Sequence, residues 1–150
     1  MAKVLGVDFG DRRTGVAVSD EARTIAFPRE TLECPLVEQA AAAVARFAEA
    51  ERAGEIVVGY PLNMDGTRGA RAERTDRFMA ELAKRTKVPL KTWDERLSTR
   101  IAESVLIEAG TRRDRRREVV DKLAAQVILQ GYLDASGSGA TEEEEPWTET

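Results

Sequence analysis

The stretch that decides the fold of this chain is Val4-Leu5-Gly6-Val7-Asp8-Phe9-Gly10-Asp11-Arg12-Arg13-Thr14-Gly15-Val16-Ala17-Val18-Ser19-Asp20. Residues 4–9 are mostly apolar and predict a buried strand, and residues 15–18 predict its hairpin partner. A carboxylate inside a buried strand costs free energy unless a partner compensates for it. Asp8 is therefore the first candidate functional residue, and a bound cation or phosphate chemistry is the usual reason for such an acid.

The composition limits the chemistry that this chain can perform. Its 150 residues suffice for one domain with a substantial core. A single cysteine, Cys34, excludes an intrachain disulfide, and no transmembrane stretch or signal peptide is present. We therefore expect a cytoplasmic protein with no membrane partner. The absence of histidine excludes Ser-His-Asp and Cys-His hydrolysis and most zinc sites, so any hydrolysis must use carboxylates, with or without hard cations.

The net charge of −4 is unevenly distributed. Residues 136–150 begin with serine and glycine and continue with glutamates, and they hold five acids and no bases. This pattern is typical of disorder. The sequence therefore predicts one domain, residues 1–135, and a disordered acidic tail, residues 136–150. Without the tail the chain is about neutral, so its overall charge neither favours nor excludes an anionic partner.

The periodicity of apolar residues predicts the order β-β-β-α-β-α-β-α-α. The predicted elements are strands at 4–9, 15–18, 24–32, 55–60 and 88–93, and helices at 36–53, 70–83, 98–109 and 118–134. Pro28 indicates that the third strand lies at an edge, and Gly54 is expected to end the first helix. We expect a five-stranded mixed sheet with helices on both faces, in which the first strand is central, paired with the second and parallel to the fourth.

Acidic side chains stand at three places where a core does not ordinarily hold them. Asp8 is in the first strand, Asp94 and Glu95 end the fifth, and Asp121 lies in the last helix. Asp121 shares a helical face with Ala125, Ile128 and Tyr132, so this helix could direct it at the strand ends. Three converging carboxylates repel one another unless cations neutralise them, and oxygen ligands select Mg²⁺ or Mn²⁺. Taken singly, each acid could instead be a turn residue or a helix cap, and Asp94 in particular could orient rather than ligate.

Four sequence blocks in the same order resemble the YqgF/RuvX family of Holliday-junction-resolvase-like proteins, also described as pre-16S ribosomal RNA nucleases. The blocks are residues 6–20, 57–66 (Val-Val-Gly-Tyr-Pro-Leu-Asn-Met-Asp-Gly), 93–99 (Trp-Asp-Glu-Arg-Leu-Ser-Thr) and 121–130 (Asp-Lys-Leu-Ala-Ala-Gln-Val-Ile-Leu-Gln). The resemblance covers roughly residues 3–134 and implies an RNase H-like fold. It also implies a metal-dependent nuclease that matures the 5′ end of pre-16S rRNA, with Asp8, Glu95 and Asp121 as the catalytic and metal-binding acids. The older description, resolution of branched DNA, rests on fold likeness.

Basic residues near the predicted acids are the candidates for binding nucleic acid. Arg112, Arg113, Arg115 and Arg116 belong to a predicted basic loop before the last helix, and phosphates held there would lie near Asp121. The same role is predicted for residues of the first hairpin and of the loop after the fourth strand, which are Arg12, Arg13, Asn63, Arg68 and Arg71. Arg74 and Arg77 are expected to be surface charges paired with acids of their own helix. A solvated charged loop is the plain alternative for each set.

Two other function classes stay open at this stage. Residues 7–15 also resemble the first phosphate loop of the actin and sugar-kinase superfamily of ATPases, but those proteins duplicate the domain and this chain shows no repeat. A non-catalytic ribosome-assembly factor is the other class. The sequence leaves the oligomeric state open between a monomer and a homodimer. The expected partner is RNA, within or outside the small ribosomal subunit, with branched DNA as the second candidate.

Overall fold

The computed structural model describes residues 2–63, 65–94 and 113–137, and at residues 113–122 and 137 it describes the backbone alone. The described elements are, in chain order, β1 (Lys3–Phe9), β2 (Arg13–Ser19), β3 (Ala26–Glu33), α1 (Val37–Ala50), β4 (Ala53–Tyr60), α2 (Ala70–Arg85), β5 (Leu90–Asp94) and α4 (Arg113–Gly137). None of the described helices is long and apolar enough to cross a membrane.

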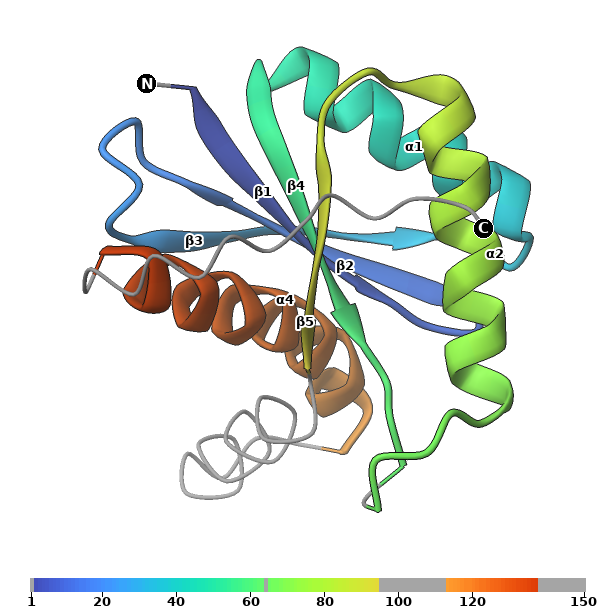
Figure 1. The fold of residues 1–150 in the computed structure, drawn as a ribbon. Helices are drawn as coiled ribbons and strands as arrows, with labels where there is room; N and C mark the ends of the chain where they lie inside the picture. Colours follow the sequence, from blue (N-terminus) through green and yellow to red (C-terminus); the bar gives the residue numbers. More distant parts are fainter. Residues whose placement is uncertain (1, 64, 95–112, 138–150) are drawn as a thin grey trace.

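The five strands form one mixed sheet in the order β3-β2-β1-β4-β5 (Figure 1). The central strand, β1, pairs antiparallel with β2 and parallel with β4. Toward the edges, β5 runs parallel to β4 and β3 runs antiparallel to β2. The predicted central position of the first strand and the edge position of the strand that contains Pro28 are both confirmed.

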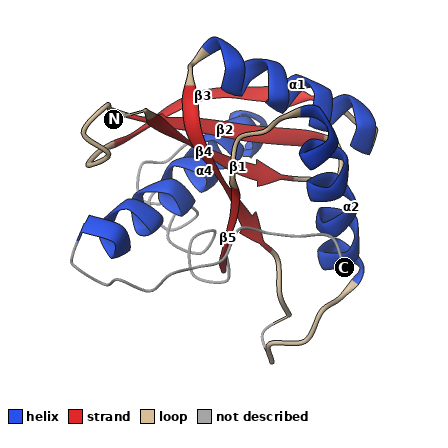
Figure 2. Ribbon diagram, turned by 45° about the horizontal axis from the view of Figure 1, so that its top comes forward, coloured by secondary structure: helices blue, strands red, loops and turns tan. Residues whose placement is uncertain are grey.

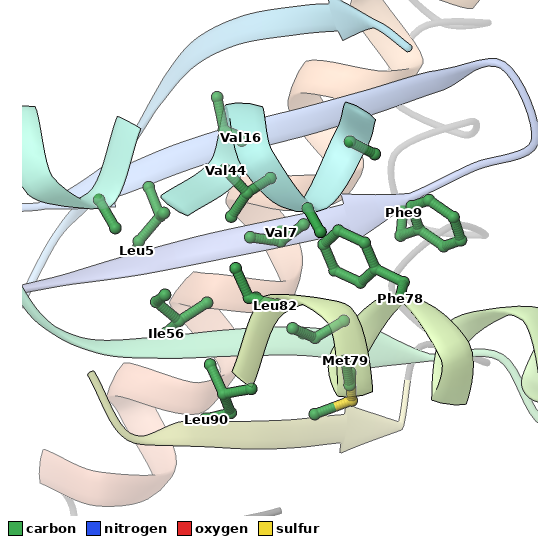
Figure 3. Packing of buried hydrophobic residues seen from close by; sticks show 14 of the residues in the cluster. Leu5, Val7, Phe9, Val16, Val44, Ile56, Phe78, Met79, Leu82 and Leu90 are labelled. Carbon is green, nitrogen blue, oxygen red and sulfur yellow. The ribbon is translucent and has the colours of Figure 1, made fainter. Parts of the chain in front are cut away.

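Helices cover both faces of the sheet, as predicted (Figures 1 and 2). On one face, α1 and α2 pack over a core to which Leu5, Val7 and Phe9 contribute from β1. Figure 3 shows this core, with side chains of the two helices seated on those of the strands. On the other face, Ala125, Leu129 and other residues of α4 pack over a smaller core. Successive side chains of a strand point to opposite faces, so β1 contributes to both layers.

The first helix ends earlier than the sequence predicts. The prediction continued it to Ala53 and ended it at Gly54, but α1 ends at Ala50, and Ala53 already begins β4. The chain reverses at Arg52, whose φ of 55° lies in the left-handed region and whose N–H donates to the carbonyl of Glu49. This conformation favours glycine but is open to other residues in a turn, and no sequence signal marked it.

The last helix begins earlier than predicted and continues further. Residues 113–117 were predicted to form a loop, but their backbone belongs to α4. Arginine has a high helix propensity, so a run of arginines extends a helix as readily as it forms a loop. At its other end, α4 continues to Gly137, into the start of the predicted tail. Residues 138–150, and the helix predicted at 98–109, lie outside the described residues.

Candidate active site

Asp8 lies near the C-terminal end of the central strand. Its neighbours Val7 and Phe9 are buried in the core beneath α1 and α2, so its own side chain points to the face that α4 covers. Asp8 is half-buried, in contrast to the fully buried Val4 on the same face of β1. The predicted acid therefore stands where the sequence placed it, at the rim of the smaller core.

The two strands that flank Asp8 have glycines at its level. Gly15 of β2 is its register partner. On the other side Val7 pairs with Val58, so the next residue of β4, Gly59, stands beside Asp8. Paired residues share a face of the sheet. The carboxylate therefore projects from a row in which neither neighbouring strand adds a side chain.

The end of β5 lies level with the same row. Trp93 pairs with Gly59, and Asp94 pairs with Tyr60. Trp93 is partly buried against the smaller core and meets the ring of Tyr132 edge-on, with the ring centroids 6.2 Å apart. Glu95 directly follows β5 and lies outside the described residues. Its predicted role is therefore untested, although the strand that leads to it, β5, pairs with β4, which lies between β5 and the strand of Asp8.

Helix α4 crosses the sheet so closely that it requires a glycine beneath it. A Cβ added to Gly6 would lie 2.6 Å from the Cβ of Leu129 and 3.1 Å from the carbonyl oxygen of Ala125. Further along α4, the hydroxyl of Tyr132 donates a hydrogen bond to Glu55, near the start of β4. The C-terminal part of the helix thus lies over the beginnings of the parallel strands, and its N-terminal part runs toward their ends.

The Gly6 contact also locates the backbone of Asp121 along α4. Asp121 is one helical turn before Ala125, on the side of the Gly6 contact that leads to the C-terminal end of β1. Its side chain is outside the description. Among the side chains that the structure does describe, no three acids, cysteines or histidines gather as they would around a metal ion. Two of the three predicted ligands are not among those side chains, so the predicted metal site remains a prediction.

The turn between β1 and β2 carries the predicted arginines nearest to Asp8. The N–H of Gly10 donates to the carbonyl of Arg13 at 2.9 Å and closes the turn. The N–H of Cys34 donates to the carbonyl of Arg12 at 3.0 Å and ties the turn to the segment before α1. Arg12 is exposed and Arg13 is half-buried. Both therefore stand a few residues from Asp8, at the same end of the sheet.

The loop between β4 and α2 is held by its own polar side chains. The amide of Asn63 donates to the hydroxyl of Thr67 at 2.9 Å. Arg68 forms an ion pair with Asp76 and also donates to the hydroxyl of Tyr60 at 3.0 Å. These contacts brace the loop and tie it to β4 and α2, and the predicted contact of Asn63 and Arg68 with nucleic acid stays a prediction. Arg71, the third predicted residue here, is exposed in the first turn of α2.

The remaining predicted arginines flank the start of α4. Arg113, Arg115 and Arg116 lie in its first turns, where the structure describes only their backbone, and Arg112 lies outside the described residues. The predicted basic loop is therefore, for these three residues, the beginning of the helix that carries Asp121. Their predicted contact with phosphates stays a prediction.

Arg74 is a residue whose place the sequence analysis missed. It was expected to pair with acids of its own helix, but its guanidinium crosses to the β1–β2 turn and forms an ion pair with Asp11 at 3.5 Å. It also lies over the ring of Phe9, 5.1 Å from the centroid. One signal was present in the sequence. Arg74 precedes the buried Phe78 by one helical turn, which places it at the border of the apolar face of α2.

Comparisons with known proteins agree on one family. Residues 2–135 match the family described as "RuvX: Holliday junction resolvase". A protein of Symbiobacterium thermophilum is 48% identical over 133 residues, which cover 89% of this chain and 92% of that protein. One of Halothermothrix orenii is 46% identical over 132 residues, which cover 88% of this chain and 94% of that protein. Both carry the name "Putative pre-16S rRNA nuclease".

Solved structures of low sequence identity share the fold. The RuvC protein of T. thermophilus, solved in complex with a Holliday junction substrate, has a TM-score of 0.61 at 15% identity, and the comparison covers 98% of this chain and all of that one. A second structure of Thermus thermophilus RuvC gives a TM-score of 0.58 at 15% identity, with 97% and 99% covered. The likeness confirms the predicted RNase H-like fold. With the family match over nearly the whole described chain and relatives above 40% identity, this protein belongs to the RuvX family.

Proposed function

We propose that this protein is a nuclease that hydrolyses phosphodiester bonds and matures the 5′ end of pre-16S ribosomal RNA in the cytoplasm. The observation that carries the proposal is the position of Asp8. A half-buried carboxylate at the end of the central strand, in a row flanked by Gly15 and Gly59, is suited to hold a ligand rather than to stabilise a core. The names of relatives at 46–48% identity point to the RNA substrate.

Asp8, Glu95 and Asp121 would hold Mg²⁺ or Mn²⁺. The donor set fits such an ion, because all three side chains offer only carboxylate oxygens and the chain has no histidine to favour another metal. A bound divalent ion supplies Lewis-acid activation of the phosphate and lowers the pKa of a bound water. The β1–β2 turn adds positive charge at this end of the sheet through Arg12 and Arg13, which would hold phosphates of the substrate.

Branched DNA is the second candidate substrate, because the family description names a Holliday junction resolvase. The chemistry would be the same, and the two candidates differ only in the nucleic acid that is bound. Recognition of RNA shape or of a ribosomal surface, which needs no contact with base edges, would suit the RNA proposal.

One experiment separates these functions. The purified protein is incubated with a 5′-extended 16S precursor RNA, with the same precursor inside isolated small-subunit particles, and with a four-way DNA junction. Each substrate is tested with Mg²⁺, Mn²⁺ or EDTA. Asp8→Asn is the test variant. Glu38→Gln, which removes one exposed carboxylate in α1 on the opposite face of the sheet, is the matched control.

We expect metal-dependent trimming of the RNA that is lost in Asp8→Asn, with unchanged folding and RNA binding, and kept in Glu38→Gln. Cleavage of the junction alone would favour the resolvase. Cleavage that survives in Asp8→Asn would refute the proposed site. No cleavage of any of the three substrates would refute the nuclease and favour a non-catalytic assembly factor.

A further inference from the structure

Arg74 of α2 joins two segments that lie far from it in the sequence. Its Nη2 donates to the carbonyl of Asp11, in the β1–β2 turn, at 2.9 Å. The same nitrogen donates to the carbonyl of Pro35, in the segment before α1, at 3.1 Å. One guanidinium therefore connects α2 with both segments. The Nε of the same planar group faces the Asp11 carboxylate at 3.5 Å, so two nitrogens in a fixed geometry face the turn, which the single nitrogen of an ammonium cannot reproduce.

The guanidinium also packs against a pair of stacked aromatic rings. Phe9 and Phe78 lie 4.4 Å apart, centroid to centroid, with an interplanar angle of 9°, and Figure 3 shows the two rings side by side. Arg74 lies over Phe9, 5.1 Å from the ring centroid, in the range of a cation–π contact. Phe9 directly follows Asp8 in β1. The contact thus ties the position of Arg74 to the end of the strand that carries the candidate catalytic acid.

The ion pair with Asp11 does not by itself explain these contacts. The Asp11 side chain is 75% exposed, and an ion pair of that kind contributes little stability. Arg74, in contrast, is only 26% exposed, and its Nε is buried without a hydrogen bond to any described residue. Burial of a guanidinium is costly. The contacts that compensate for it are the ones that hold the backbone of the turn.

The turn itself has few contacts of its own. Its internal hydrogen bond runs from Gly10 to Arg13, and the bond from Cys34 to the carbonyl of Arg12 comes from outside. The contacts of Arg74 with Asp11 supply the third support described for the turn, and they hold the residue between these two bonds.

We propose that Arg74 is a positioning residue, which fixes the β1–β2 turn so that Arg12 and Arg13 meet substrate phosphates beside Asp8. This inference rests on the proposed nuclease function and assigns that site a residue outside the predicted set. Arg74 itself does not contact the substrate. It acts through the turn, so its loss weakens substrate binding and leaves Asp8, which is held by the pairing of β1 with its neighbours, in place.

The test compares Arg74→Ala and Arg74→Lys with Arg77→Ala, an exposed arginine of the same helix. Steady-state cleavage of the precursor RNA is measured beside thermal unfolding. We expect the KM of both Arg74 variants to rise by about tenfold and kcat to stay within about twofold of the wild type. Lysine keeps the charge but not the fork, so its failure to restore KM shows that geometry is what matters. Arg77→Ala should match the wild type.

A double variant shows whether Arg74 acts through the turn. If it does, Arg74→Ala and Arg12→Ala have non-additive effects on KM, because the first already misplaces the group that the second removes. Additive effects would overturn the proposal. So would a KM that stays unchanged while kcat falls together with the folded fraction, since that pattern indicates only a loss of stability.

Limited digestion with trypsin separates failure of this inference from failure of the proposed function. The turn contains trypsin sites at Arg12 and Arg13, and no nucleic acid is needed for the measurement. Faster cleavage there in Arg74→Ala than in Arg77→Ala is expected. A wild-type protein that cleaves no nucleic acid would refute the proposed nuclease function. Faster digestion of Arg74→Ala at the turn would then still support the conclusion that Arg74 restrains the turn. Equal digestion rates for Arg74→Ala and Arg77→Ala would refute the restraint of the turn by Arg74, whatever the nuclease assay shows.

Discussion

Replacing Gly6 by alanine is expected to push α4 away from the sheet. Gly6 is buried in β1, and an added Cβ would lie 2.6 Å from the Cβ of Leu129 and 3.1 Å from the carbonyl oxygen of Ala125. Neither obstacle is the end of a flexible side chain, so the helix itself must move. A return to van der Waals contact requires a shift of about 0.8 Å.

The cost follows from overpacking. Extra carbon in a well-packed core destabilises by about 1–3 kcal/mol, and alanine recovers about 0.4–1 kcal/mol by restricting the unfolded chain. The midpoints of these two ranges leave a net loss of about 1.3 kcal/mol, which lowers the Tm of a chain of this size by roughly 3–5 °C. Gly54→Ala is the matched control. Its Cβ also meets an atom at 2.6 Å, but that atom belongs to Ala2, which precedes β1 and can shift.

The same shift should reduce catalysis, because α4 carries Asp121, one of the three acids proposed to be catalytic. A displacement approaching 1 Å at a catalytic group lowers kcat by roughly 10–100-fold. Thermal unfolding and steady-state RNA cleavage of Gly6→Ala and Gly54→Ala measure both effects. If Gly6→Ala kept the Tm and kcat of the wild type, or if Gly54→Ala lost as much, the argument from the Gly6 contact would be wrong.

Two further predictions concern stability. Gln130→Leu removes the side-chain oxygen that accepts the N–H of Ala26 at 2.9 Å and leaves that N–H without its partner. The free energy of unfolding, measured with denaturant, should fall by about 1–3 kcal/mol. A change below about 0.5 kcal/mol would contradict this. The N–H groups of Ile25 and Thr24 and the Thr24 hydroxyl lower the pKa of Asp20 below 3.8. The stabilisation from the ionised Asp20 is therefore present above pH 3.8 and is lost as pH falls through the lower folded-state pKa. The difference in stability between wild type and Asp20→Asn should be smaller at about pH 3 than at about pH 6. A difference that stays constant with pH would refute this prediction.

The sheet could be predicted from the sequence because its signals are local. The apolar run at residues 4–9 and the hairpin after it predicted a central strand, and Pro28 predicted an edge strand. Asp8 could be singled out for the same reason, since its interruption of a buried run is visible without a structure. The residue pattern also singled out Asp94, Glu95 and Asp121, and the family resemblance then selected Glu95 and Asp121 to act with Asp8. The side chains of Glu95 and Asp121 lie outside the description, so these two roles rest on sequence alone.

The contacts of α2 could not be predicted, because their partners are distant in the sequence. Arg74 has Glu73 and Asp76 close by, and local rules pair it with its own helix. Its observed partner, Asp11, is 63 residues away. Asp76 is bound instead by Arg68. Periodicity reports which face of a helix is buried, but not which loop its border residues reach.

Successive side chains of β1 point to opposite faces of the sheet, so this strand contacts both helical layers. Because Asp8 points to one face and Phe9 to the other, the end of this strand is fixed from two layers at once. The contact at Gly6 sets how closely α4, the helix that carries Asp121, approaches the sheet. On the other face, Arg74 of α2 lies over Phe9 and positions the turn that contains Arg12. The helix with Asp121 and the turn with Arg12 are therefore positioned by separate layers. Damage to the α4 contact should lower kcat, whereas damage to the α2 contact should raise KM and leave kcat nearly unchanged.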